Sequence, residues 1–367
     1  MAYEATGKIK IPWRALTMVG ALLAIWVVFT TTTDGIFLTP RNLSNLFRQM
    51  AVTSILAVGM VLVIVAGQID LSVGALTGFL GALSAMMFVN HGWPLWAAFL
   101  LPMTVGGLIG LSQGFLVSRF SIPPFIVTLG GMLICQGALL GATGGVAISP
   151  TPDYLYIGQS YLPLNLGWVL AVLAALLLGW RAAKSQGPAR WGALGLAVLV
   201  LGFTAVTNSY EGVPLPVLLL LVLAAGLSAV AAHTPFGRHL YAIGGNPEAA
   251  FYSGIDSRKR IMQVFALMGV LAGVAGIVLT ARVGSATSDA GKMMELDAIA
   301  AAVIGGTSLM GGRGTVWGAL LGGLVMASLD NGMSLMNTEA FWQPILKVGI
   351  LILAVGIDMA GRKPGTR

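Results

Sequence analysis

Charged side chains are scarce in this sequence, because Asp, Glu, Lys and Arg together make up 9% of its 367 residues. A typical soluble domain carries about 25% charged residues, so this chain lacks the material for a water-facing surface. Hydrophobic residues account for 57%, and the mean hydropathy is +0.89. The composition excludes a soluble enzyme, a nucleic-acid-binding protein and a secreted disulfide-rich domain, and it predicts a polytopic membrane protein.

Chemically reactive residues and motifs are scarce as well. The chain has one cysteine, Cys135, and three histidines, too few for an internal disulfide or a structural zinc site. No phosphate-binding loop of the G-x-x-x-x-G-K-[ST] type occurs, and no HExxH motif is present. We therefore expect no catalysis, no metal and no cofactor bound by this chain, and no ATP hydrolysis through such a loop.

Long apolar runs are what the sequence has in abundance. A helix needs about 20 apolar residues to cross a bilayer, and twelve such segments occur, two of them short (297–309 and 314–329). The sequence thus predicts one all-α membrane domain over residues 1–367, with about 10–12 transmembrane helices and a glycine-broken or re-entrant pair. The segments are 13–33, 47–67, 71–89, 94–117, 124–144, 166–183, 190–207, 214–232, 261–280, 297–309, 314–329 and 342–360.

The basic residues predict the orientation. With the N-terminus in the cytoplasm, fifteen of the twenty Lys and Arg residues fall on the inner side, four fall outside and Lys347 lies within a span. Positive charge concentrates in cytoplasmic loops, so both termini are expected in the cytoplasm. The inner residues are Lys8, Lys10, Arg14, Arg119, Arg181, Lys184, Arg190, Arg238, Arg258, Lys259, Arg260, Arg313, Arg362, Lys363 and Arg367.

The inner connection 233–260 is the most informative loop. Gly244, Gly245 and Asn246 are expected to form a turn, after which Asn246 caps a short helix that starts at Pro247 and ends near Gly254. Glu248 lies in its first turn, where the helix dipole favours an anion. Two interpretations follow: an ordinary capped connector, or a docking helix for a cytoplasmic partner.

Three long motifs carry a family resemblance. GRHLYAIGGNPEAAFYSGI (237–255), ELDAIAAAVIGGTSLMGGRGTVWGALLGG (295–323) and GQIDLSVGALTG (67–78) resemble the permease subunits of ATP-binding-cassette importers for ribose, xylose and arabinose. The similarity extends from residue 39 to residue 336. Two extra hydrophobic segments within 164–213 indicate the D-xylose branch of this family. Gln68 departs from the family, in which Glu or Gly is expected before IDLS.

The resemblance implies an assembly and a mechanism. Two copies of the chain would form a translocation pathway in the inner membrane of a bacterium, surrounded by lipid. A cytoplasmic ATP-binding cassette subunit would use ATP and Mg²⁺ and clamp the inner loops, while a periplasmic binding protein would deliver the sugar. Docking to the ATPase would then involve Gly237, Arg238, Gly244, Gly245, Asn246, Glu248, Ala249, Ala250 and Gly254.

Polar residues within or beside the spans are the candidates for the pathway. Asp70 with Ser72 fits a helix N-cap as well as a pathway role, and Asp297 opens a helix where the dipole favours acids. Thr307 and Ser308 lie in a glycine-rich break, which either exposes backbone at a transport site or permits close helix packing. The candidate set is Gln68, Asp70, Ser72, Asp297, Thr307, Ser308 and Asn331.

Some expectations compete with the importer interpretation or concern single residues. The first alternative is the same importer class with ribose, arabinose or another small polar solute. The second is a proton-coupled sugar carrier, for which Asp70 is the one candidate proton-binding group. Lys347 is expected to extend its ammonium group to the outer interface. A weak repeat at an offset of 240 relates Val63 and Gly74 to Val303 and Gly314.

Overall fold

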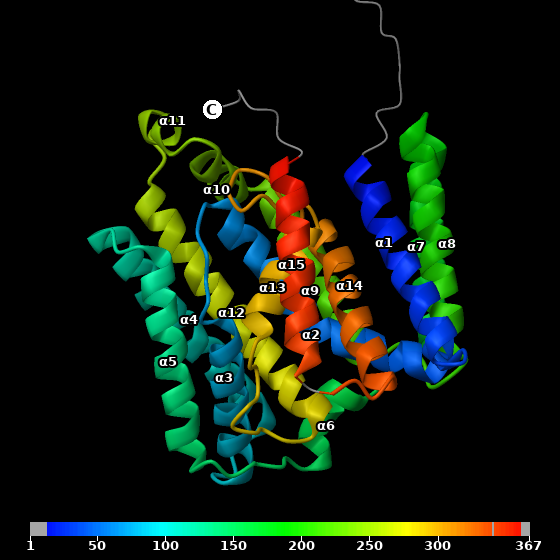
Figure 1. Ribbon diagram of the computed structural model, residues 1–367, viewed down its shortest axis with the longest axis horizontal. Coiled ribbons are helices and arrows are strands. Elements are labelled where there is room, and N and C mark those ends of the chain that lie inside the picture. Colours follow the sequence, from blue (N-terminus) through cyan, green and yellow to red (C-terminus); the bar gives the residue numbers. More distant parts are fainter. Residues whose placement is uncertain (1–12, 340, 361–367) are drawn as a thin grey trace, which may run out of the picture. The chain divides into compact units, whose positions relative to one another are not determined.

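The structure, a computed structural model, describes residues 13–339 and 341–360, and this part of the chain is built from α-helices (Figure 1). The predicted all-α class is confirmed. The elements are α1 (Trp13–Thr32), η1 (Ile36–Leu38), α2 (Pro40–Val65), α3 (Val73–Val89), α4 (Leu95–Phe120), α5 (Pro124–Thr143), α6 (Pro152–Gln159), α7 (Leu164–Lys184), α8 (Pro188–Asn208), α9 (Leu215–His233), α10 (Pro235–Gly245), α11 (Pro247–Tyr252), α12 (Ser257–Val283), α13 (Met294–Ile304), α14 (Val316–Leu335) and α15 (Trp342–Ala360).

Many of these helices can cross a membrane. Within the described residues, seven are long and apolar enough to do so, and each of the twelve predicted segments coincides with one helix. The chain is thus a multi-pass membrane protein, as predicted. The shorter apolar helices are Met18–Thr32 and α3, and α13 has only 11 residues. The seven long spans are α2, α4, α5, α7, the range 189–208 within α8, α9 and α12.

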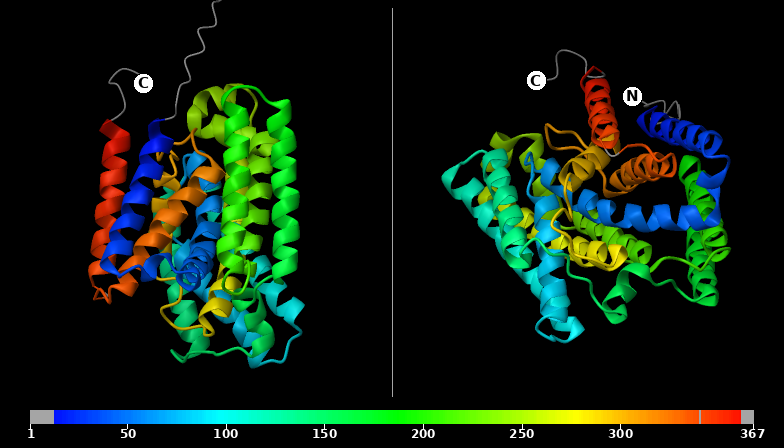
Figure 2. Two further views of the ribbon diagram at one scale, coloured as in Figure 1. Left: turned by 90° about the vertical axis from the view of Figure 1, so that its right-hand side faces the viewer. Right: turned by 60° about the horizontal axis from the view of Figure 1, so that its bottom comes forward.

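The chain divides into two compact units. The first comprises Met1–Ser44 and Tyr161–Pro214. In it, α7 and α8 lie side by side as an antiparallel pair (Figure 2). The amide of Asn208 at the end of α8 donates to the carbonyl oxygen of Leu164 at 3.1 Å, which closes the pair. This unit holds the region 164–213 that suggested the xylose branch.

The second unit comprises Asn45–Ser160 and Leu215–Arg367, and α12 lies at its centre against α3 and α4. Glycines permit this close packing. A Cβ on Gly106 of α4 would strike the carbonyl oxygen of Gly269 in α12, and one on Gly269 would strike that of Gly106. Small residues at such crossings let helix backbones approach in a membrane. The second part of α2, residues 51–65, is completely buried in this unit.

Two breaks interrupt the helices of the second unit. After α2 ends at Val65, residues 66–72 leave the level of α10 and run as a non-helical segment to the start of α3 (Figure 1). The second break, residues 305–315, separates α13 from α14 and fits the predicted broken pair. At an offset of 240, residues 66–72 correspond to 306–312, which lie within the second break; the repeat itself stays a prediction. Irregular backbone at membrane depth requires burial in protein or an aqueous cavity.

Candidate functional site: a coupling loop against two helix breaks

The connection from α9 to α12 contains two helices where the sequence predicted one. Thr234 caps α10, because its hydroxyl accepts from the amide of Gly237 at 3.2 Å. The expected turn at Gly244 and Gly245 is wrong, since both residues are the last of α10 and only Asn246 is extended. The prediction failed because a pair of glycines is typical of turns, whereas here it permits close backbone contact.

The helix α11 begins and ends as predicted. The side chain of Asn246 accepts from the amide of Ala249 at 3.0 Å, Pro247 follows the cap, and Glu248 lies in the first turn. At the other end, Gly254 has φ +76, and the amide of Ile255 reaches back to the carbonyl oxygen of Ala250 at 3.1 Å. A left-handed glycine in this position ends a helix by satisfying its last carbonyls.

One surface of α11 is left uncovered. Glu248 and Ala249 are exposed, and the rings of Phe251 and Tyr252 are 71% and 78% exposed while only Ala250 is buried. Large apolar side chains exposed together commonly mark a binding surface. These two aromatic residues are not among the predicted docking residues. Their position in the helix was readable, but their exposure depends on how α11 packs against its neighbours.

The opposite side of the loop is anchored to the second helix break. The hydroxyl of Tyr241 donates to the carbonyl oxygen of Gly314 at 2.7 Å, and burial raises the pKa of this phenol, which keeps it a donor. Gly237 is buried against the end of α9, whereas Arg238 is exposed. At the start of α12, Arg260 donates from Nε to Nδ1 of His239 at 3.0 Å.

Gly244 contacts both helix breaks. It lies in the connection between α9 and α12, residues 234–256, which we call the coupling loop after its predicted role. The amide of Gly312 donates to the carbonyl oxygen of Val65, the last residue of α2, at 2.9 Å. A Cβ on Gly244 would strike that oxygen and would lie 2.8 Å from the nitrogen of Gly312. We call this contact of Val65, Gly244, Gly311 and Gly312 the glycine junction. It joins α2, α10 and the connection between α13 and α14.

The junction predicts opposite effects at two adjacent glycines. Gly244 and Gly245 are the last two residues of α10, and helix propensity alone favours alanine over glycine at both positions. Packing reverses this for Gly244→Ala, which we expect to destabilise the protein by about 1–3 kcal/mol, as overpacking does. Gly245→Ala is the matched control, because its Cβ would have only the Cα of Gly312 at 4.0 Å. Thermal unfolding of the two purified variants tests this, and equal stability of both variants would refute the junction's role.

The predicted pathway residues Thr307 and Ser308 lie beside this junction. They are 2% and 7% exposed, and the amide of Ser308 donates to the carbonyl oxygen of Arg313 at 2.9 Å. Arg313 is exposed, and its cytoplasmic position stays a prediction. Among the described residues, the buried hydroxyl oxygen of Thr307 has no hydrogen-bond partner. Buried polar groups are normally satisfied, so this hydroxyl is available to a water molecule or a solute.

The first break holds a second polar cluster. One carboxylate oxygen of Asp70 accepts from the amide of Ser72 at 2.9 Å and from its hydroxyl at 2.6 Å. The amide of Gln113 in α4 donates to that hydroxyl at 3.1 Å. Ser72, rather than Asp70, is the N-cap residue of α3, and its side chain makes no capping bond. Gln68 is half-buried, and its carbonyl oxygen Oε1 has no hydrogen-bond partner within residues 13–339 and 341–360.

These bonds predict the outcome of changing Asp70. Asp70→Asn keeps an oxygen that can accept both bonds from Ser72, so we expect uptake close to that of the wild type. Asp70→Ala leaves the buried amide of Ser72 without its acceptor, and leaves the Ser72 hydroxyl only the Oε1 of Gln113 at 3.3 Å, at a cost of about 1–3 kcal/mol. Transport assays normalised to membrane abundance distinguish the two variants. Complete loss of uptake in Asp70→Asn at normal abundance would instead assign the charge itself to the pathway.

Asp297 belongs to a third polar cluster, an ion-pair triad with Lys347 and Asp330. The ammonium of Lys347 donates to Asp297 at 2.9 Å and lies 2.8 Å from a carboxylate oxygen of Asp330. The expectation that Lys347 extends to the interface is therefore wrong: it turns inward and joins α13, α14 and α15. Hydropathy reveals a lysine in a span but not its partners, and Asp330 was missed for this reason. Asn331, the next residue of α14, is buried at 4% exposure.

The predicted pathway set thus separates into several places. Gln68, Asp70 and Ser72 lie at the first break, Thr307 and Ser308 at the second, and Asp297 in the triad. All except Gln68 are buried within the protomer. Their roles in transport stay predictions. The coupling set, by contrast, forms one continuous loop from Gly237 to Gly254.

Known proteins resemble this chain over nearly its whole length. The xylose transport system permease protein XylH of Escherichia coli K12 is 46% identical over 364 residues, covering 95% of this chain and 93% of that protein. The protein of the same name from Haemophilus influenzae Rd is 44% identical, over 94% and 96% of the two chains. The ribose import permease protein RbsC of Bacillus subtilis 168 is 34% identical, over 92% and 90%.

No solved structure matches the chain. A family model does match, over residues 42–355, and it describes the branched-chain amino acid transport system permease component. This range contains both helix breaks, the coupling loop and the triad, and the resemblance seen in the three motifs is confirmed. The chain therefore belongs to the family of branched-chain amino acid transport system permease components.

Proposed function

We propose that this chain is the membrane-spanning permease subunit of an ATP-driven importer, and that its solute is a pentose, D-xylose. The relatives named as xylose permeases are 46% and 44% identical to it. Those named for ribose and D-allose are 32–35% identical over a similar length. This difference favours xylose among relatives that are named for related small sugars.

The single observation that supports the transport mechanism is that the coupling loop has one exposed side and one side packed against the helix breaks. Its outer side presents Glu248, Phe251 and Tyr252 to a partner. Through Gly244, its inner side contacts the C-terminal end of α2 and the connection between α13 and α14. A displacement of α11 would therefore be transmitted through the short helix α10 to both helix breaks. These breaks border buried polar groups.

The proposal includes partners for this loop and for the whole chain. A cytoplasmic ATP-binding cassette subunit docks on α11 and uses ATP and Mg²⁺, which explains why a chain without a phosphate-binding loop can be driven by ATP. A second copy of the chain completes the pathway, and a periplasmic sugar-binding protein delivers the solute. The assembly lies in the bacterial inner membrane with both termini in the cytoplasm, as the distribution of basic residues supports.

Sugar competition tests the solute. The permease, reconstituted with its ATP-binding and sugar-binding partners, should take up labelled D-xylose, and a tenfold excess of unlabelled D-ribose or D-allose should leave most of that uptake in place. The matched control replaces the sugar-binding protein by one from a ribose importer. Uptake of ribose in preference to xylose with the native binding protein would contradict the assignment.

A proton-coupled sugar carrier is the second candidate, and the triad favours it specifically. The sequence offered only Asp70 as a proton-binding group in the bundle, whereas the structure adds Asp297 and Asp330 beside Lys347. Carboxylates within the membrane are functional candidates by default. An uptake assay driven by a proton gradient without ATP separates this candidate from the importer.

A further inference from the structure

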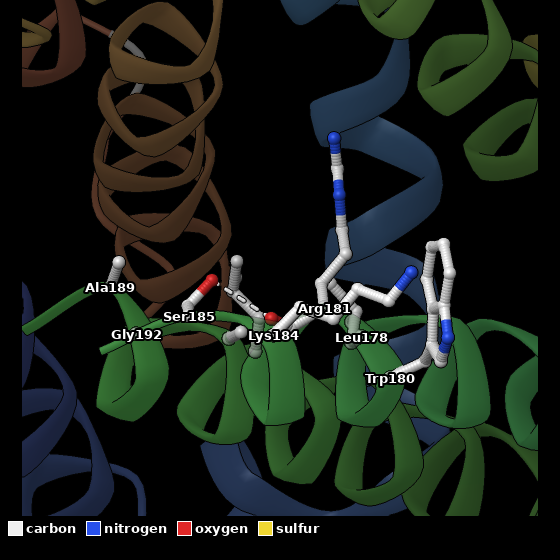
Figure 3. Close-up of a pocket in the computed structure, with 9 residues that line it drawn as sticks. Leu178, Trp180, Arg181, Lys184, Ser185, Ala189 and Gly192 are labelled. Carbon is white, nitrogen blue, oxygen red and sulfur yellow. Dashed lines mark hydrogen bonds between the residues drawn. The ribbon is translucent and has the colours of Figure 1, made fainter. Parts of the chain in front are cut away.

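A cavity lies where α7 ends and α8 begins, within the first unit and far in sequence from the coupling loop (Figure 3). Its volume is about 460 Å³, and all of its lining residues come from these two helices and their connection. The lining residues are Leu178, Trp180, Arg181, Lys184, Ser185, Ala189, Gly192, Ala193 and Leu196. No residue described so far as part of the transport machinery belongs to it.

The polar side of the cavity is cationic. Arg181 and Lys184 are exposed side chains in the last turn of α7, and no Asp or Glu occurs among the lining residues. The helix dipole explains why cations lie at the C-terminal end of α7. It does not explain the cavity between α7 and α8. The first turn of α8 lies opposite and has no side-chain cap, so it adds partial positive charge to the same space.

The other side of the cavity is apolar, and its residue types are typical of the interface between membrane and water. The ring of Trp180 is 57% exposed, and the ammonium of Lys184 lies 3.9 Å from its centroid. Trp191 at the start of α8 is 72% exposed. Tryptophan is enriched at the level of lipid headgroups. Both helices are apolar enough to cross the membrane, and little of either is buried in the protein.

A second copy of the chain does not fit this surface well. Two-fold symmetric contacts place the same patch of each copy against the other. With the axis of such a contact at this cavity, Arg181 and Lys184 would face the same two cations of the partner, with no acid among the lining residues to offset them. An anionic ligand with apolar chains satisfies both sides of the cavity, since its charge meets the cations and its chains follow α7 and α8.

We propose that this cavity binds the phosphate headgroup of an anionic phospholipid, with Arg181 and Lys184 as the phosphate-binding residues. The acyl chains lie along the exposed apolar side chains of the two helices, such as Leu178 and Leu196. Basic pockets between membrane helices are known to take anionic headgroups. The proposal depends on the chain being a membrane protein and not on which sugar it carries.

Native mass spectrometry of the full-length permease tests this site. The detergent-solubilised protein is titrated with phosphatidylglycerol, with phosphatidylcholine of the same acyl chains, and separately with inorganic phosphate. We expect tighter binding of phosphatidylglycerol, and a loss of roughly thirty-fold in its affinity when Arg181→Gln and Lys184→Gln are combined, since each basic residue near the surface contributes. The exchange Arg181→Lys with Lys184→Arg keeps the charge and should keep the binding.

A matched control comes from α4. Arg119 is also an exposed cation in the last turn of an apolar span, and it does not line this cavity. Arg119→Gln should leave the preference for phosphatidylglycerol unchanged. Three results would overturn the proposal: equal binding of the two lipids by the wild type, occupation of the site by inorganic phosphate in competition with lipid, or a shift from dimer to monomer in the double variant without lipid binding.

Discussion

Glu248→Arg is expected to abolish sugar uptake while the chain is still made and inserted in the membrane. Glu248 is exposed in the first turn of α11, where the positive end of the helix favours an anion. An arginine there removes this stabilisation and reverses the charge on the surface proposed to face the ATPase. For a central residue of an interface we expect a loss of at least roughly thirty-fold in affinity for the ATPase subunit.

Co-purification and uptake measure this effect together. A matched control is Asp289→Arg, which reverses an exposed acidic residue in the connection after α12, paired only with exposed Lys292 at 3.8 Å. That variant should keep the ATPase bound. If Glu248→Arg retained both a normal amount of ATPase and normal uptake, α11 would lose its role as the docking helix.

Lys347→Met is expected to destabilise the protein more than any other change considered for the spans. It removes the cation shared by Asp297 and Asp330, with which Lys347 makes contacts of 2.9 and 2.8 Å. Breaking a fully buried ion pair from one side costs about 3–5 kcal/mol, and the loss at this largely buried triad, where Lys347 and Asp330 are 17% and 16% exposed, should approach the lower end of that range. The thermal unfolding midpoint of the purified protein should therefore fall sharply.

The triad predicts a specific rescue. Combining Lys347→Met with Asp297→Asn and Asp330→Asn removes the unpaired charges and should recover most of the lost stability, because neutral groups are less costly to bury than ions. Lys292→Met is the matched control, since its pair with Asp289 is exposed and 3.8 Å long. A Lys347→Met protein as stable as the wild type would show that the triad contributes nothing to folding.

Features set by short-range rules could be predicted from the sequence. The spans follow from apolar length alone, and α11 follows from Asn246 as a cap, Pro247 after it and Gly254 in the left-handed region. These signals act within one helix, so neighbouring elements do not change them. The second break was also predictable, because the glycines of 305–314 interrupt an apolar run.

Features that depend on distant partners could not be predicted. Lys347 reads as an interfacial lysine until Asp297 and Asp330 are placed beside it. Gly244 reads as a turn residue until the backbone of Val65 is placed against it. The gap between the predicted segments 47–67 and 71–89 falls within the break at 66–72, but the burial of Asp70 there, at 1% exposure, depends on the surrounding helices. Each requires knowledge of which helices meet.

The source of energy for uptake tests the central claim most directly. The permease, purified with its accompanying subunits, is reconstituted in vesicles with the sugar-binding protein and supplied either with ATP and Mg²⁺ or with a proton gradient alone. The account predicts a stoichiometric ATP-binding subunit and D-xylose uptake that requires ATP. A chain that purifies alone and accumulates the sugar with only a proton gradient would contradict it, and Asp297, Asp330 and Asp70 would then be the proton-binding candidates.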